Sequence, residues 1–108
     1  MSEIDPARAA ALLADGSHVL IDVREDAEFA AGHAPAAHHV PLGRLAATDL
    51  PAGVELIAVC RSGGRSSRAV TVLAARGRTV HNLTGGMQAW SDAGLPVRDD
   101  RGEPGAVA

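Results

Sequence analysis

Apolar positions along the chain form short blocks that alternate between strand-like runs and helix-like spacing. Near-continuous apolar runs at residues 18–23 and 56–60 are rich in β-branched and aliphatic side chains, and they predict strands buried on both faces. Shorter runs predict two further strands at residues 38–40 and 78–83. Strands that alternate with helices imply right-handed crossovers, and therefore an α/β fold with a mainly parallel sheet covered on both faces.

Helices are predicted between these strands. Asp5 followed by Pro6 is a typical helix start, because Asp caps the first turn and proline suits its first position. Gly16 can end that helix in a left-handed conformation. Residues 66–76 place apolar side chains at helical spacing. Further helical segments are predicted near residues 25–31, 42–45 and 86–93.

The length of the chain, 108 residues, is typical of a single domain. We assign residues 1–98 to that domain. Residues 99–108 are short of large apolar side chains and rich in Gly, Pro and charge, which predicts a flexible C-terminal tail.

Composition narrows the classes of function. Aromatic residues make up 2% of the chain, so the core is expected to be aliphatic, and the net charge of −3 argues against a general binder of nucleic-acid phosphates. The longest apolar run, residues 9–14, is far shorter than the roughly 20 residues of a membrane span. No signal peptide is recognisable, so we expect a cytoplasmic protein. The net charge and the short apolar runs together predict that it binds neither nucleic acids nor membranes.

The chain has one cysteine, Cys60, which excludes an internal disulfide and a cysteine-rich zinc site. It ends a predicted strand, where α/β folds commonly place their ligands. The segment between this cysteine and the next helix contains two glycines, two arginines and two serines: Arg61, Ser62, Gly63, Gly64, Arg65 and Ser66. Adjacent glycines let backbone N–H groups converge on one centre, and a helix N-terminus favours negative charge there. These effects favour a thiolate, and therefore predict that Cys60 is a nucleophile in an anion-binding loop.

Other candidate residues favour a structural interpretation. Asp22 and Arg24 lie at a predicted strand end and are interpreted as an ion pair or hydrogen-bond anchor that supports neighbouring loops. His38 and His39 are adjacent on a predicted strand, so they would point to opposite faces, and with His33 they do not predict a metal site. His81 is interpreted as a histidine of the core edge or the surface. We expect neither a metal nor a cofactor.

Three ordered motifs carry a resemblance to a known family. They are DVRE at residues 22–25 with EF at 28–29 and GH at 32–33, CRSGGRS at 60–66, and LTGGMQAW at 83–90 with GLPV at 94–97. Over about residues 5–97 the chain resembles the single-domain rhodaneses, the thiosulfate sulfurtransferase family. The resemblance implies a five-stranded, mainly parallel sheet flanked by helices on both faces.

The resemblance also implies a mechanism. The Cys60 thiolate would attack the outer sulfur of a donor such as thiosulfate, release sulfite and retain a persulfide. A thiophilic acceptor, such as cyanide, a thiol or a sulfur-accepting protein, would then remove that sulfur. Arg61 and Arg65 are expected to bind the sulfonate end of the donor through charge-assisted hydrogen bonds.

Two alternatives remain open. Phosphatases and arsenate reductases also use a cysteine and an arginine on an anion-binding loop. In those enzymes a spacing of five residues between the two is associated with phosphate-sized anions. In this chain four residues separate Cys60 from Arg65. A non-catalytic rhodanese-like binding or regulatory module is the second alternative. Such modules often lack the cysteine that this chain retains.

Overall fold

The computed structural model describes residues 2–108, and this part of the chain forms five strands, four α-helices and one 3-10 helix. In chain order these elements are β1 (Ser2–Ile4), α1 (Pro6–Ala14), β2 (His18–Asp22), α2 (Asp26–Ala31), β3 (His38–His39), η1 (Leu42–Arg44), β4 (Glu55–Val59), α3 (Gly64–Ala75), β5 (Val80–Leu83) and α4 (Gly86–Asp92).

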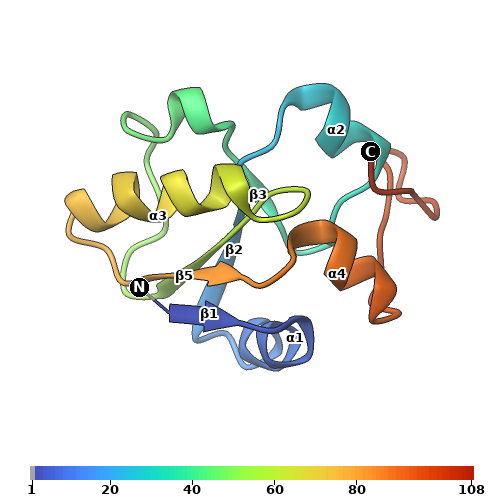
Figure 1. Cartoon of the computed structure of the whole chain (residues 1–108), viewed down its shortest axis with the longest axis horizontal. Coiled ribbons are helices and arrows are strands. Elements are labelled where there is room, and N and C mark those ends of the chain that lie inside the picture. Colours follow the sequence, from blue (N-terminus) through green and yellow to red (C-terminus); the bar gives the residue numbers. More distant parts are fainter. Residues whose placement is uncertain (1) are drawn as a thin grey trace.

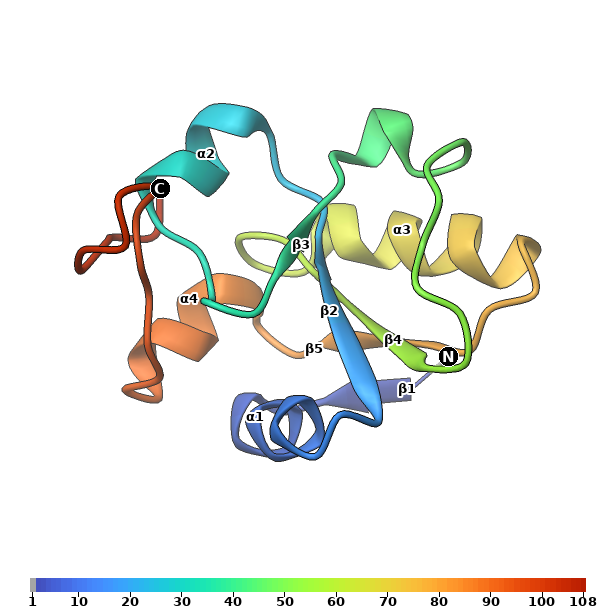
Figure 2. The ribbon, with the colours of Figure 1, turned by 180° about the vertical axis from the view of Figure 1, so that it is seen from behind.

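The strands form one sheet in the order β1-β5-β4-β2-β3, and every pair of neighbours is parallel. Helix α3 covers one face, whereas α1 and α4 pack on the other (Figures 1 and 2). The predicted α/β fold with a five-stranded sheet covered on both faces is therefore confirmed. None of the helices in residues 2–108 combines the length and apolar character needed to cross a membrane.

Strand β4 shows why the sheet is buried on both sides. Leu56 and Ala58 belong to the core beneath α3, whereas Ile57 and Val59 belong to the core beneath α1 and α4. This alternation follows from the two-residue period of a strand. A strand surrounded in this way has little freedom to shift, so the residue that follows it, Cys60, is held in a defined place.

The structure differs from the sequence-based expectations at an edge strand and at the start of a helix. Strand β1 was not predicted from its apolar pattern, because only Ile4 among its three residues is buried. Helix α3 begins at Gly64, two residues before the predicted start at Ser66. Two glycines before Ser66 suggested a loop, but the second already has helical geometry and shortens the loop after Cys60.

The C-terminal tail lies against α2 (Figure 1). The amides of Asp100 and Ala106 donate to the carbonyls of Ala30 and Ala31, at 3.2 and 3.1 Å. Gly32 allows this contact, because a Cβ there would collide with the backbone of Ala106. The tail thus has a defined position against the domain, and its flexibility stays a prediction.

Candidate active site

The sulfur of Cys60 lies at the carboxyl end of β4, in the short loop that leads into α3. The residue is only 1% exposed, although exposed residues follow it directly. The amide of Gly63 donates a hydrogen bond to Sγ at 3.0 Å. The sulfur is therefore buried but accepts a hydrogen bond from the backbone. Such an environment favours an anionic sulfur.

Helix α4 fixes the shape of this loop from behind. The amide of Met87 donates to the carbonyl of Cys60 at 2.8 Å, and the amide of Gln88 donates to that of Arg61 at 3.0 Å. Gly86 makes the approach possible, because a Cβ at this position would lie 2.5 Å from the Cys60 carbonyl oxygen. Because these carbonyls turn toward α4, the loop presents N–H groups toward the sulfur.

Ser66 and Asn82 complete the surroundings of the sulfur. The buried hydroxyl of Ser66 lies 3.4 Å from Sγ, and it also reaches the side-chain oxygen of Asn82 at 2.5 Å and the carbonyl of Gly63 at 3.1 Å. A hydroxyl has one hydrogen to donate, so these neighbours compete for it. Asn82 was missed by sequence reasoning; the available signal was a polar residue inside a strand, where asparagine is uncommon.

Two opposing effects act on the thiol. Burial raises the pKa of Cys60, but the Ser66 hydroxyl and the amides of Ser66, Gly63 and Ser62 outweigh it, and the net pKa is lowered. A lower pKa increases the thiolate fraction at neutral pH, and the thiolate is the nucleophilic form. The loop can therefore supply an activated sulfur without a histidine base.

Arg65 connects the loop to α2. Its guanidinium donates to both carboxylate oxygens of Glu28, at 2.5 and 2.8 Å, and the two side chains are 30% and 24% exposed. The hydrogen bonds from Arg65 lower the pKa of Glu28 to about 2. The ion pair holds the Arg65 side chain against α2. The expected role of Arg65 in donor binding stays a prediction. Arg61 is exposed and forms no ion pair within residues 2–108.

Asp22 and Arg24 form a fully buried ion pair beside this edge of the sheet. Arg24 Nη2 donates to Asp22 Oδ2 at 2.7 Å and to the carbonyl of Gly32 at 2.8 Å. Arg24 Nη1 also reaches the carbonyl of Glu28 at 3.4 Å. These bonds anchor α2 to the end of β2, in line with the structural interpretation.

Two of the three clustered histidines pack against Phe29. The rings of His33 and His39 stack on Phe29, with centroid distances of 3.8 and 4.2 Å. His33 Nδ1 donates to the carbonyl of Phe29, and His39 Nε2 donates to that of Arg24. One ring nitrogen of each of these two histidines therefore binds the backbone, and His38 is exposed.

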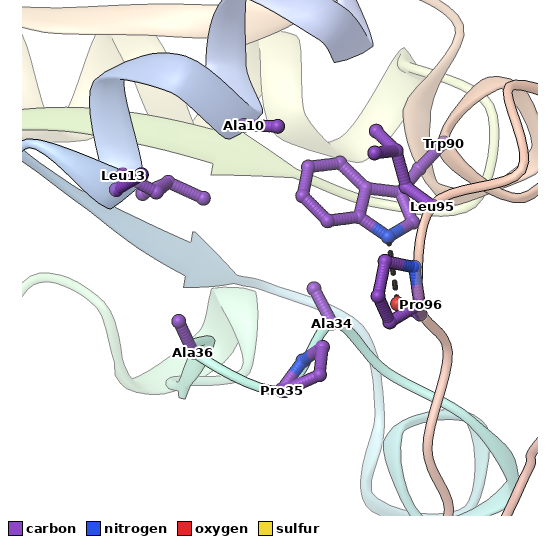
Figure 3. Close-up of a pocket in the computed structure, with 9 residues that line it drawn as sticks. Ala10, Leu13, Ala34, Pro35, Ala36, Trp90, Leu95 and Pro96 are labelled. Atoms are coloured by element: carbon purple, nitrogen blue, oxygen red, sulfur yellow. Dashed lines mark hydrogen bonds between the residues drawn. The ribbon is translucent and has the colours of Figure 1, made fainter.

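An apolar cavity of about 240 Å³ lies away from the cysteine, between α1, α4 and the segment after α2 (Figure 3). Trp90 lines it and donates from Nε1 to the carbonyl of Pro96 at 2.9 Å. None of residues 60–66 lines this cavity. Trp90 is 4% exposed, as expected for a core residue.

The chain is similar to a known protein family and to solved structures. Residues 5–93 match the family described as "Rhodanese-like domain". The chain belongs to this family. A rhodanese-related protein from Thermoplasma volcanium has a similar structure, with a TM-score of 0.82 at 26% identity over 90% of this chain and 97% of that one.

Curated relatives of this rhodanese-like chain include proteins named as sulfurtransferases. A sulfurtransferase of Allochromatium vinosum is 37% identical over 101 residues, covering 90% of this chain and 94% of the relative. Thiosulfate sulfurtransferase 18 of Arabidopsis thaliana is 34% identical, covering 95% and 88%. The chain spans 50% of the length of an uncharacterized Synechocystis protein that is 37% identical over 80% of this chain. These relatives support a transferase role at the level of the family.

Proposed function

We propose that this protein is a sulfurtransferase that carries sulfane sulfur as a persulfide on Cys60. The observation that carries the proposal is the buried Cys60 sulfur, which accepts a hydrogen bond from the Gly63 amide and lies beside the Ser66 hydroxyl. The loop that stabilises a thiolate also stabilises the persulfide anion, because the donors are in place before the reaction.

The reaction has two steps. With thiosulfate as donor, the Cys60 thiolate attacks the outer sulfur and a new S–S bond forms. The S–S bond of the donor breaks, and sulfite leaves with its electron pair. A thiophilic acceptor such as cyanide then attacks the outer sulfur of the persulfide, leaves as thiocyanate and restores the thiolate. The thiosulfate sulfurtransferase among the relatives supports this choice of donor.

The acceptor must come from outside the chain. Cys60 is the only cysteine, so no second thiol can attack the persulfide within the molecule. Arg61 directly follows Cys60 and is exposed, so its positive charge would favour the approach of an anionic donor or acceptor. Thiols, cyanide and sulfur-accepting proteins are the classes of acceptor that fit.

The loop length favours sulfur transfer over phosphate chemistry. Four residues lie between Cys60 and Arg65, and the first turn of α3 begins at Gly64. The resulting loop holds a single sulfur atom against the Gly63 amide. The retained cysteine likewise favours an enzyme over a non-catalytic module.

The test compares the wild type with Cys60→Ser in a thiosulfate:cyanide assay. We expect thiocyanate formation by the wild type and none above background for the variant, because a hydroxyl cannot carry the sulfur. Ser67→Ala is the matched control, since this exposed hydroxyl lies on the same helix and binds the Gly63 carbonyl, not the sulfur. Full activity of Cys60→Ser would exclude the mechanism. Aryl phosphate hydrolysis that depends on Cys60 would support the phosphatase alternative instead.

A further inference from the structure

A second cluster of chemically active side chains lies at the opposite, amino end of the central strands. His18, Glu55 and His81 come from β2, β4 and β5. His18 is the register partner of Glu55, and His81 pairs with Ile57, two residues further along β4. Since side chains two residues apart share a face, all three side chains project from the same face of the sheet.

Their ligand atoms converge. Glu55 Oε1 lies 2.7 Å from His81 Nε2 and 3.5 Å from His18 Nε2, and the three ligand atoms all lie within 4.8 Å of one another. Within residues 2–108 this is the one group of His, Cys, Asp and Glu side chains with such an arrangement. A cavity of about 310 Å³ adjoins all three residues.

The other nitrogen of each histidine is held by a serine. His18 Nδ1 lies 2.7 Å from Ser17 Oγ, and Ser17 Oγ donates to the carbonyl of Leu12, so it can accept from the imidazole. His81 Nδ1 is hydrogen-bonded to Ser2 Oγ. Metal-binding histidines almost always have their second nitrogen hydrogen-bonded, because the bond fixes the orientation and tautomer of the ring.

We propose that His18 Nε2, His81 Nε2 and the Glu55 carboxylate bind a Zn²⁺ ion, with a fourth position open to water. Two histidines and a carboxylate are a known zinc ligand set. Tetrahedral bonds of about 2.0 Å place ligand atoms about 3.3 Å apart, so the 3.5 Å contact already fits and the 2.7 Å contact opens by about 0.6 Å. The hydrogen that His81 Nε2 donates to Glu55 moves to Nδ1, where Ser2 Oγ accepts it.

Charge and position are consistent with this assignment. Glu55 supplies the negative charge, because a glutamate carboxyl with an ordinary pKa is ionised at neutral pH. Arg8 lines the same cavity but is exposed, so solvent screens its charge. Cys60 directly follows β4, five residues after Glu55, and is therefore about 16 Å away at about 3.3 Å per residue. The ion would therefore tie β2, β4 and β5 together and would not enter the chemistry at Cys60.

The experiment measures Zn²⁺ binding by titration calorimetry on the tag-free, metal-depleted chain. We expect one equivalent to bind, with affinity weaker by about tenfold or more in His81→Ala and in Glu55→Gln. His38→Ala is the matched control, because His38 is an exposed strand histidine outside the cluster. Cys60→Ser is the second control and should bind like the wild type.

Thermal unfolding gives a second measurement. Zn²⁺ should raise the Tm of the wild type, His38→Ala and Cys60→Ser, since ligands that bind the folded state stabilise it. At the same Zn²⁺ concentration, the Tm of His81→Ala and of Glu55→Gln should rise by less, because their affinity for the ion is lower. Absence of stoichiometric binding, unchanged affinity in both cluster variants, or loss of binding in Cys60→Ser would each overturn the proposal. Glu55 is 48% exposed, so Glu55→Gln gives a test that does not depend on a core substitution.

Discussion

The two ends of β4 carry two different kinds of polar site. At the carboxyl end, Cys60 is buried and its sulfur is stabilised by backbone amides and one hydroxyl. At the amino end, His18, Glu55 and His81 meet through their side chains beside an open cavity. The carboxyl-end site depends on backbone shape, whereas the amino-end cluster depends on residue identity.

This difference determines how each site should respond to substitution. Changes near Cys60 act through burial and loop geometry, and should be costly even where the altered residue does not react. The side chains at the amino end are partly exposed to solvent. In the absence of metal, their substitution should therefore lower the free energy of unfolding only slightly. The following predictions test this contrast.

The largest expected effect on stability is at the buried ion pair. Asp22→Ala leaves the Arg24 guanidinium buried without its carboxylate, and breaking such a pair costs about 3–5 kcal/mol. Glu55→Ala, with a chelator present, removes a half-exposed carboxylate and should cost much less, because solvent screens exposed ion pairs. Urea unfolding of both variants measures the two costs. Similar costs for both would remove the contrast between the two ends.

The next effect is on activity, through the glycine behind the loop. Gly86→Ala puts a Cβ against the carbonyls of Cys60 and Arg61, and we expect about a hundredfold loss of activity, as a displacement of about 1 Å can cause. Gly94→Ala is the control, because Gly94 also has a positive φ (77°) but a Cβ added there would meet no other atom within 4 Å. Thiosulfate:cyanide kinetics on both variants separate loop displacement from backbone strain. Equal activity in the two variants would show that α4 does not shape the loop.

A smaller, pH-dependent effect is expected for Glu28→Gln. The Arg65 guanidinium lowers the pKa of Glu28 from its ordinary 4.5 to about 2. This depressed pKa stabilises the fold above pH 4.5, and the contribution is lost as the pH falls through about 2. The variant should therefore be less stable by about 1–2 kcal/mol at neutral pH, and the difference should shrink between pH 4.5 and 2. Urea unfolding at a series of pH values measures it, and a pH-independent difference would contradict the pairing.

The smallest effect is expected at the hydroxyl beside the sulfur. Ser66→Ala removes a hydrogen bond that lowers the pKa of Cys60, so the pKa should rise and the thiolate fraction at neutral pH should fall. Alkylation by iodoacetamide should slow several-fold, with its rate–pH curve shifted to higher pH. Ser67→Ala should leave the rate unchanged. A Ser66→Ala rate equal to that of the wild type would exclude the hydroxyl from the stabilisation of the thiolate.

The two ends of the sheet also differ in what could be predicted from the sequence. The carboxyl-end loop is contiguous, so its cysteine, glycines and serines can be recognised along the chain. Of its supports from elsewhere, Asn82 was missed, and Gly86 was recognised only as part of a motif. The contacts that give both residues a role form only when β5 and α4 pack against the loop.

The amino-end cluster was not predicted for a related reason. His18, Glu55 and His81 are far apart in the sequence, and only the register of three parallel strands brings them together. Strand β1 was missed because its pairing depends on β5, not on its own apolar pattern. The alternating strands and helices were predicted because local periodicity determines them.

The central claim is that the loop after β4 makes Cys60 a sulfur carrier, and intact-mass measurement tests it most directly. After incubation with thiosulfate and removal of excess donor, the wild type should gain the mass of one sulfur atom. Addition of cyanide should remove that mass, and Cys60→Ser should never acquire it. A wild-type mass unchanged by the donor, or an added sulfur that persists in Cys60→Ser, would contradict the claim.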